Sequence, residues 1–141
     1  MLLLALVACG NINPVDGTYL GEVQDFSAED ACETVWGVDL VALQAANATD
    51  ILVASDRESM TLDDSLACTL FDEAFNCLQT DEDRGASAYV ETRVVVTGEF
   101  TSSYDLVSEW DLRATCEGDG CGELAEDCTI NWTFAASYVG Y

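Results

Sequence analysis

Hydrophobic and polar positions alternate with a period of two along the second half of the chain. In three segments the even-numbered positions are mostly apolar or aromatic and the odd-numbered positions mostly polar: residues 88–100, 104–116 and 128–138. This alternation is typical of a β-strand with one buried face. Residues 101–103, Thr-Ser-Ser, separate the first two segments, so we predict a long hairpin there. The three segments together predict a curved antiparallel meander.

The first half of the chain contains shorter segments of the same kind. We predict strands at residues 17–23, 35–43, 51–55, 59–62, 66–71 and 74–78. The last two flank Asp72 and Glu73 as a tight hairpin, and its register puts Cys68 opposite Cys77, where a cross-strand disulfide forms easily. An acidic loop that contains Phe26 is expected to run on to Cys32. This loop, or residues 43–47, is expected to hold a turn of helix.

The pattern predicts one all-β domain over residues 17–141. Strands that alternate throughout must close into a barrel or split into two sheets, because open sheet edges promote association. We therefore expect a single antiparallel meander closed as a small β-barrel, with a β-sandwich as the alternative. Aromatic side chains on the apolar faces either form the core or line a ligand cavity. They are Trp36, Phe100, Tyr104, Trp110, Trp132, Phe134 and Tyr138.

The first ten residues carry a motif that indicates where the protein resides. An apolar run ends in Leu6-Val7-Ala8-Cys9 and is followed by Gly10. This ending resembles the lipobox of bacterial lipoproteins, in which the signal peptide is cut before a cysteine that then carries lipid. The resemblance implies a signal-peptide remnant over residues 1–8 and a lipidated Cys9 that begins a tether over residues 9–16. Because no Lys or Arg precedes Cys9, we expect the true start to lie upstream.

Two further expectations follow from resemblance to known families. In the sorting rule of Gram-negative lipoproteins, a glycine rather than an aspartate after the cysteine implies transfer to the outer membrane, so Gly10 implies a place in the bacterial cell envelope. Gly17-Thr18-Tyr19 and the long final meander are similar to the opening and topology of a lipocalin-type barrel.

The cysteines support export independently. There are seven: Cys9, Cys32, Cys68, Cys77, Cys116, Cys121 and Cys128. If Cys9 carries lipid, six remain, which suits three disulfides in an oxidising compartment. A zinc site is disfavoured because the chain has no histidine and only one cysteine pair has a suitable spacing.

The barrel topology suggests how the remaining four cysteines pair. In a closed barrel with an even number of strands, the last strand begins beside the loop that follows the first strand. This predicts a Cys32–Cys128 bridge and leaves Cys116 to pair with Cys121. Six cysteines allow fifteen connectivities, and the other connectivities stay open at this point.

The charge of the chain excludes one class of partner. Asp and Glu number 27 against four Arg and no Lys, for a net charge of −23. Nucleic acids bind through Lys and Arg, so we expect no nucleic-acid partner. An acidic surface attracts divalent cations or a basic partner, and it also keeps a protein soluble in a salty medium.

The residue types argue against enzymatic activity. Without His or Lys, the common nucleophile–base pairs are absent. Carboxylate-only glycoside hydrolysis is the alternative, but the paired acids lie at predicted turns. These pairs are Asp63-Asp64, Asp72-Glu73 and Glu126-Asp127. We therefore predict that the protein is not an enzyme.

Calcium is the cofactor for which the sequence offers candidate ligands. One predicted loop contains Asp81, Glu82 and Asp83, and a second has Glu117 and Asp119 around the Cys116–Cys121 loop. Calcium prefers oxygen ligands of this kind. Neither loop has the EF-hand spacing, however, and solvated acidic loops are the plainer interpretation. We expect no cofactor, with Ca²⁺ as the alternative.

These observations give two hypotheses about function. The first is an exported, acidic lipoprotein, held on the membrane through lipid on Cys9, with a structural or surface role. The alternative is a binding module for a small apolar ligand, Ca²⁺ or a basic partner. An interior packed solid with aromatic rings would argue against the small apolar ligand.

Overall fold

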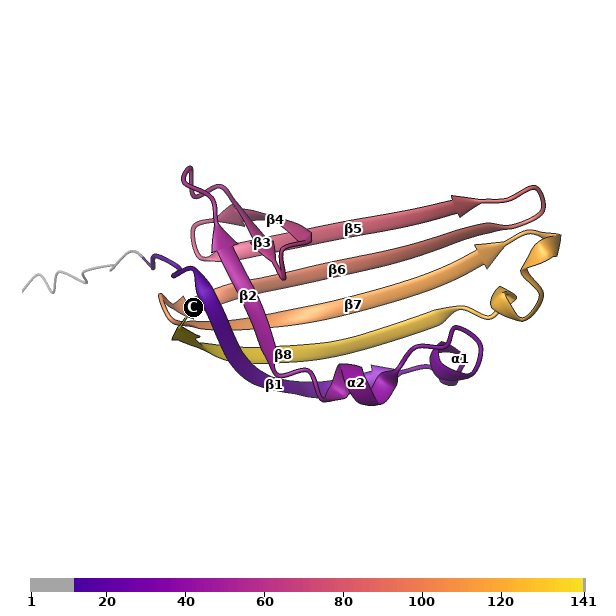
Figure 1. The fold of residues 1–141 in the computed structure, drawn as a ribbon, viewed down its shortest axis with the longest axis horizontal. Helices are drawn as coiled ribbons and strands as arrows, with labels where there is room; N and C mark the ends of the chain where they lie inside the picture. Colours follow the sequence, from indigo (N-terminus) through magenta and orange to yellow (C-terminus); the bar gives the residue numbers. More distant parts are fainter. Residues whose placement is uncertain (1–11, 141) are drawn as a thin grey trace, which may run out of the picture.

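The computed structural model describes residues 12–140 and contains a closed antiparallel barrel of eight strands (Figure 1). Each strand pairs with the next along the chain, and β8 pairs back with β1. The predicted all-β barrel is confirmed, and the sandwich alternative is wrong. Cys9 and the lipobox lie outside the described residues. None of the described helices is long and apolar enough to cross a membrane.

The elements differ greatly in length. The strands are β1 Gly17–Ala28, β2 Ala48–Val53, β3 Ser59–Leu62, β4 Leu66–Phe71, β5 Ala74–Arg84, β6 Tyr89–Ser102, β7 Asp105–Glu117 and β8 Cys128–Gly140. The helices are α1 Asp30–Thr34, α2 Leu40–Gln44 and the 3-10 helix η1 Asp119–Ala125. The three alternating segments of the second half correspond to β6, β7 and β8. The predicted bounds of β3 and β4 are confirmed.

This difference in length divides the barrel into two parts (Figure 1). At one end, called the closed end, β2, β3 and β4 complete the ring. β4 pairs with β5 only over Ala74–Cys77, and β2 pairs with β1 only over Gly17–Leu20. Beyond these residues β5–β8 and the end of β1, which pairs with β8 as far as Ala28, continue as an open sheet, defined as residues 25–28, 78–84, 89–95, 110–117 and 128–132. α1, α2 and η1 lie at this second end, called the open end.

The strand predicted over residues 35–43 is wrong. Gly37 has a φ of 68°, which interrupts an extended chain, and α2 begins three residues later. Asp39 caps this helix, since its Oδ1 accepts a hydrogen bond of 3.0 Å from the Ala42 N–H. A turn of helix was expected in residues 43–47 or in the loop before Cys32. Helices form at both places: α1 begins in that loop at Asp30, and α2, Leu40–Gln44, overlaps the start of residues 43–47.

Two other strands are longer than predicted. β1 continues to Ala28, so Phe26 is not in a loop; its ring stacks on Trp132 with centroids 6.2 Å apart. β5 continues to Arg84 and pairs with β6 along its whole length. The acidic residues expected in a loop at 81–83 therefore lie in a strand. β2 spans Ala48–Val53 rather than residues 51–55.

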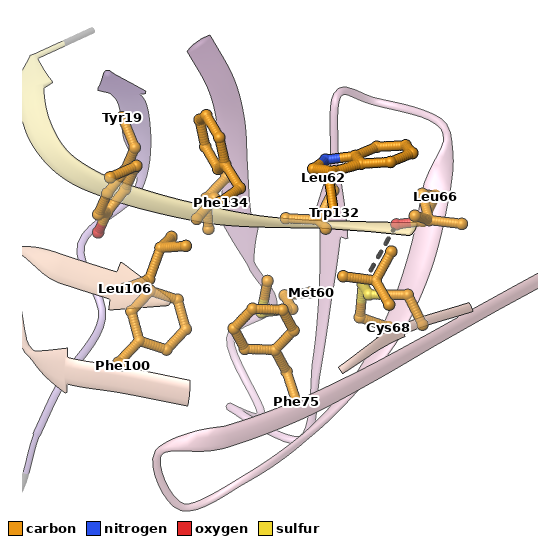
Figure 2. Close-up of a cluster of buried hydrophobic side chains, with 14 of the residues drawn as sticks. Tyr19, Met60, Leu62, Leu66, Cys68, Phe75, Phe100, Leu106, Trp132 and Phe134 are labelled. Atoms are coloured by element: carbon orange, nitrogen blue, oxygen red, sulfur yellow. Dashed lines mark hydrogen bonds between the residues drawn. A yellow bond between two sulfur atoms is a disulfide. The ribbon is translucent and has the colours of Figure 1, made fainter. Parts of the chain in front are cut away.

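The core fills the closed end. Side chains from all around the ring point inward, and the rings of Tyr19, Phe75 and Phe100 are almost completely buried (Figure 2). The Phe100 ring lies 5.5 Å from the Phe75 ring and 6.2 Å from the Tyr19 ring, centroid to centroid. Burial of such rings contributes about 1.5–3 kcal/mol each. The inward rings therefore pack against one another instead of lining a chamber.

Three disulfides join the six described cysteines. They link Cys32 to Cys128, Cys68 to Cys77, and Cys116 to Cys121, which confirms the predicted pairing. The first ties α1 to the start of β8, the second joins directly opposed residues of β4 and β5, and the third closes the loop between β7 and η1.

Candidate functional site

The inward face of the open sheet is the candidate site. At the closed end this face is covered by the opposite wall of the barrel, but beyond Cys77 the strands β2–β4 no longer reach it. Val90, Val94, Trp110 and Leu112 on this face are consequently only half-buried. The Trp110 ring stacks on Trp132 with centroids 5.4 Å apart and an interplanar angle of 11°. The result is a partly exposed apolar strip along the open sheet.

Two carboxylates border this apolar strip. Successive side chains of a strand point to opposite faces, so Asp81 and Asp83 lie on the same face as the buried Cys77. Their partners across the ladder are Thr92 and Val90. Both aspartates are exposed to solvent. The inward face of the open sheet therefore combines negative charge with apolar surface.

The same part of β5 forms a free sheet edge. The N–H of Gly85 donates to the Ala88 carbonyl and that of Phe100 donates to the Glu73 carbonyl, each over 2.8 Å. Because hydrogen-bonding direction alternates along a strand, these bonds imply that odd-numbered residues of β5 bond to β6. The backbone groups of Thr80 and Glu82 therefore face outward from the sheet. Charged residues on such an edge hinder unspecific pairing with other chains.

The other edge of the open sheet is covered. The Cys32–Cys128 disulfide joins α1 to β8, and the Trp36 Nε1–H donates to the Glu126 carbonyl over 2.7 Å. The N–H of Glu29 donates to the Thr129 carbonyl over 3.1 Å. The connection between β1 and β2 thus shields the β1 side, so the β5 edge is the accessible one.

The structure does not bring the four calcium candidates together. Asp81 and Asp83 share a face, but residues two apart in a strand are separated by about 6.7 Å along it. Glu117 is paired with Tyr89, on the outward face, and Asp119 belongs to η1. Over residues 12–140, no group of three or more acidic or cysteine side chains is arranged to hold a metal ion.

Glu117 and Asp119 nevertheless line one hollow at the tip of the open end. The hollow has a volume of about 530 Å³, and Arg84 also lines it. Gly118 permits this arrangement: its φ is 111°, and a Cβ there would lie 2.4 Å from the Ser87 carbonyl oxygen. A bound cation would be repelled by the guanidinium group of Arg84, which disfavours a calcium site here.

Tyr89 is the centre of a polar cluster on the outward face of the same tip. Its hydroxyl donates to Glu91 Oε2 over 3.1 Å, and the guanidinium of Arg84 lies 4.8 Å from the ring centroid. The carboxylates of Glu82 and Glu91, together with partial desolvation, raise the pKa of Tyr89 to about 12. The phenol therefore stays neutral under ordinary conditions and holds the β5–β6 hairpin through hydrogen bonding.

The segment before β1 is part of the barrel. The Val15 N–H donates to the Ser103 carbonyl over 3.2 Å, and the Tyr19 hydroxyl donates to the Val15 carbonyl over 2.7 Å. Asp16 Oδ1 accepts from the Val53 N–H over 2.7 Å. Val15 and Asp16, the last two residues of the predicted tether over residues 9–16, are therefore bonded to the barrel. Pro14 is buried. The apolar residues Ile12, Pro14 and Val15 are the sequence signal that could have indicated contact with the barrel.

Comparisons with known proteins identify no relative. No family model, no curated protein and no solved structure matches this chain. Three features of the chain itself bear on its function: the packed closed end, the three disulfides, and the open sheet with its acidic, accessible edge.

Proposed function

We propose that the protein is an exported bacterial lipoprotein, held on the cell envelope through lipid on Cys9, with a non-catalytic surface role. The cysteine pairing carries this proposal. Three disulfides use all six cysteines that follow Cys9, so none of them remains to pair with it. Three disulfides suit an oxidising compartment, and the odd cysteine stands where a lipobox requires it. Gly10 favours the outer membrane as its destination.

The interior of the barrel supports a surface role over storage of a small apolar ligand. Such ligands occupy chambers lined by apolar side chains. Here Phe75 and Phe100 are 2% and 1% exposed and contact each other in the closed end. The absence of His and Lys from the sequence supports a non-catalytic role as well.

Expression of the full chain with an upstream signal sequence in a bacterial host tests the anchoring. We expect the wild type to enter the detergent phase on phase partitioning and the Cys9→Ser variant to stay in the aqueous phase. Mass spectrometry of the N-terminal peptide should show diacyl or triacyl modification of Cys9. A Cys9→Ser variant that still enters the detergent phase, or an unmodified Cys9 in the wild type, would refute the proposal.

A second candidate function is binding of a basic partner at the open sheet. The observation that favours it is the combination of a free β5 edge with Asp81 and Asp83 beside a half-buried apolar strip. A segment with Lys or Arg on one face and apolar residues on the other matches this surface in charge and in polarity.

Titration with a synthetic amphipathic peptide rich in lysine tests this second function. We expect the double variant Asp81→Asn with Asp83→Asn to bind the peptide about tenfold more weakly, a loss of about 1.4 kcal/mol. The matched control is Glu58→Gln with Glu73→Gln, which removes the same charge at the closed end. Equal weakening in both variants would mean that net charge alone attracts the peptide, and this would refute a site on the open sheet.

A further inference from the structure

The closed end of the barrel carries an apolar rim. We define the rim as Phe71, Tyr104 and Val139, whose side chains are 78%, 56% and 57% exposed. Phe71 ends β4, Tyr104 lies in the β6–β7 turn, and Val139 lies near the end of β8. Figure 1 shows that these three places belong to the same end of the molecule. The Tyr138 N–H donates to the Tyr104 carbonyl over 2.7 Å. This bond holds the β6–β7 turn next to the end of β8, where Val139 follows Tyr138.

The described chain also begins at this end. The segment before β1 is fixed there by the bonds of Val15 to Ser103 and of Asp16 to Val53. Cys9 stands three residues before Ile12, where the described chain starts. Three residues span at most about 11 Å even when fully extended. A lipid on Cys9 would therefore hold the closed end, and no other part of the barrel, close to a bilayer.

Charge does not distinguish the two ends. Acidic residues are exposed at the open end, along residues 81–83 of β5 and residues 117–127 around η1, and equally at the closed end, at Asp56, Glu58, Asp63, Asp64, Asp72 and Glu73. An anionic membrane surface repels such segments, and the repulsion falls off within about 10 Å. Because both ends are acidic, the position of the chain start and the apolar rim, and not charge, determine which end faces the bilayer.

The closed end also carries one arginine, Arg57. Arg57 lines a hollow of about 780 Å³ there, together with Asp16 and Tyr104. Within residues 12–140, Arg57 and Arg93 have no ion-pair partner, whereas Arg84 and Arg113 pair with Glu82 and Asp111. A guanidinium next to an exposed tyrosine is suited to the phosphate and headgroup region of a bilayer.

We propose that the closed end is the membrane-facing surface of this protein. In this orientation Phe71, Tyr104 and Val139 enter the headgroup region, Arg57 contacts lipid phosphate, and the open sheet points away from the bilayer. The inference rests on the proposed lipidation of Cys9. With the closed end on the bilayer, the open sheet and its β5 edge face away from the membrane, where a binding partner can reach them.

Hydrogen exchange on vesicle-bound protein tests the orientation. The full chain is coupled through the Cys9 thiol to a maleimide-headgroup lipid in vesicles of phosphatidylcholine and phosphatidylglycerol. Coupling is selective because the other six cysteines form disulfides. We expect amides at residues 54–58 and 102–105 to exchange about tenfold more slowly than in the uncoupled protein, and those at 85–88 and 118–127 to be unchanged. Equal slowing at both ends, slowing at the open end only, or no slowing would overturn the proposal.

Matched variants connect the protection to the rim. Phe71→Ser with Tyr104→Ser should abolish the slowing at the closed end. The control is Val41→Ser with Leu78→Ser, whose side chains are 74% and 56% exposed but lie outside the closed end, and it should preserve the slowing. Protection that survives loss of Phe71 and Tyr104 would overturn their role. Because the coupling is chemical, this result is independent of lipidation in the cell, which the partitioning of the Cys9→Ser variant tests separately.

Discussion

At the scale of single residues, Asp105 fixes the β6–β7 turn. Its carboxylate accepts hydrogen bonds from the Ser137 and Ser102 hydroxyls, over 2.5 and 2.7 Å, and these bonds lower its pKa. A lowered pKa in the folded protein stabilises the fold above the ordinary carboxyl pKa of 3.8, and this contribution disappears as the pH falls through the lowered value. We expect Asp105→Asn to lower the melting temperature at neutral pH, and the difference from wild type to close below pH 3.8.

The measurement for Asp105 is a series of thermal melts from acidic to neutral pH. Asp72→Asn, in the exposed β4–β5 turn, is the control and should show no such convergence with the wild type. If the deficit of Asp105→Asn were the same at every pH, the stabilisation would have to come from side-chain packing and not from the ionised carboxylate.

At the scale of elements, the disulfides should differ in their effect on stability. In the chain-entropy description a bridge stabilises more when it closes a longer loop. The Cys32–Cys128 bridge spans 96 residues and the Cys116–Cys121 bridge spans 5. We expect paired Cys→Ser substitution to lower the free energy of unfolding by about 4.7 kcal/mol for the first bridge and about 2 kcal/mol for the second. Urea denaturation measures both, and a larger loss for Cys116–Cys121 would contradict this ranking.

The acidic part of β5 gives a second prediction at this scale. Asp81 and Asp83 lie on a strand whose outer edge is unpaired beyond Cys77. Because charge on a free edge hinders strand-to-strand pairing, Asp81→Val with Asp83→Val should favour association of the domain. We expect dimers or larger species in size-exclusion chromatography at concentrations at which the wild type elutes as a monomer. The same substitutions at Glu58 and Glu73, which are exposed and lie away from the free edge, are the control and should leave the elution unchanged.

The elements also show which parts of the structure can be predicted from sequence. β6, β7 and β8 were predictable because one face of each points into the barrel or carries the apolar strip of the open sheet, so the alternation is strong. α2 was not, since Trp36, Val38 and Leu40 alternate as in a strand, while the cap at Asp39 becomes visible only in the folded chain.

The open sheet could not be derived from local pattern. The last seven residues of β5 are exposed on both faces, so they carry no apolar alternation, and pairing with β6 alone makes them a strand. The free edge arises because β4 stops pairing at Cys77 while β6 continues, which is a relation between strands. Two disulfides were predictable from relations between strands. The register of the β4–β5 hairpin places Cys68 opposite Cys77, and closure of the barrel brings Cys32 close to Cys128.

At the scale of the whole molecule, the net charge of −23 must oppose folding through self-repulsion. Over the described residues the structure has two ion pairs, both between exposed side chains, so little of this repulsion is offset locally. Salt should therefore stabilise the domain by screening. We expect the melting temperature to rise with sodium chloride, and to be equal in calcium chloride at matched ionic strength, because no described cluster of carboxylates is arranged to hold the ion.

Thermal melts in the two salts separate screening from binding. A ligand that binds only the folded state adds about 2.7 kcal/mol at a hundredfold excess over its dissociation constant, so millimolar calcium would reveal even a weak site. If calcium gave an additional rise, the variants Asp81→Asn and Glu117→Gln would locate it, since these carboxylates lie on opposite faces of the open sheet. Equal melting curves in the two salts would mean that the acidic residues bind no calcium and act only through their long-range negative potential. This potential repels an anionic bilayer and attracts basic partners.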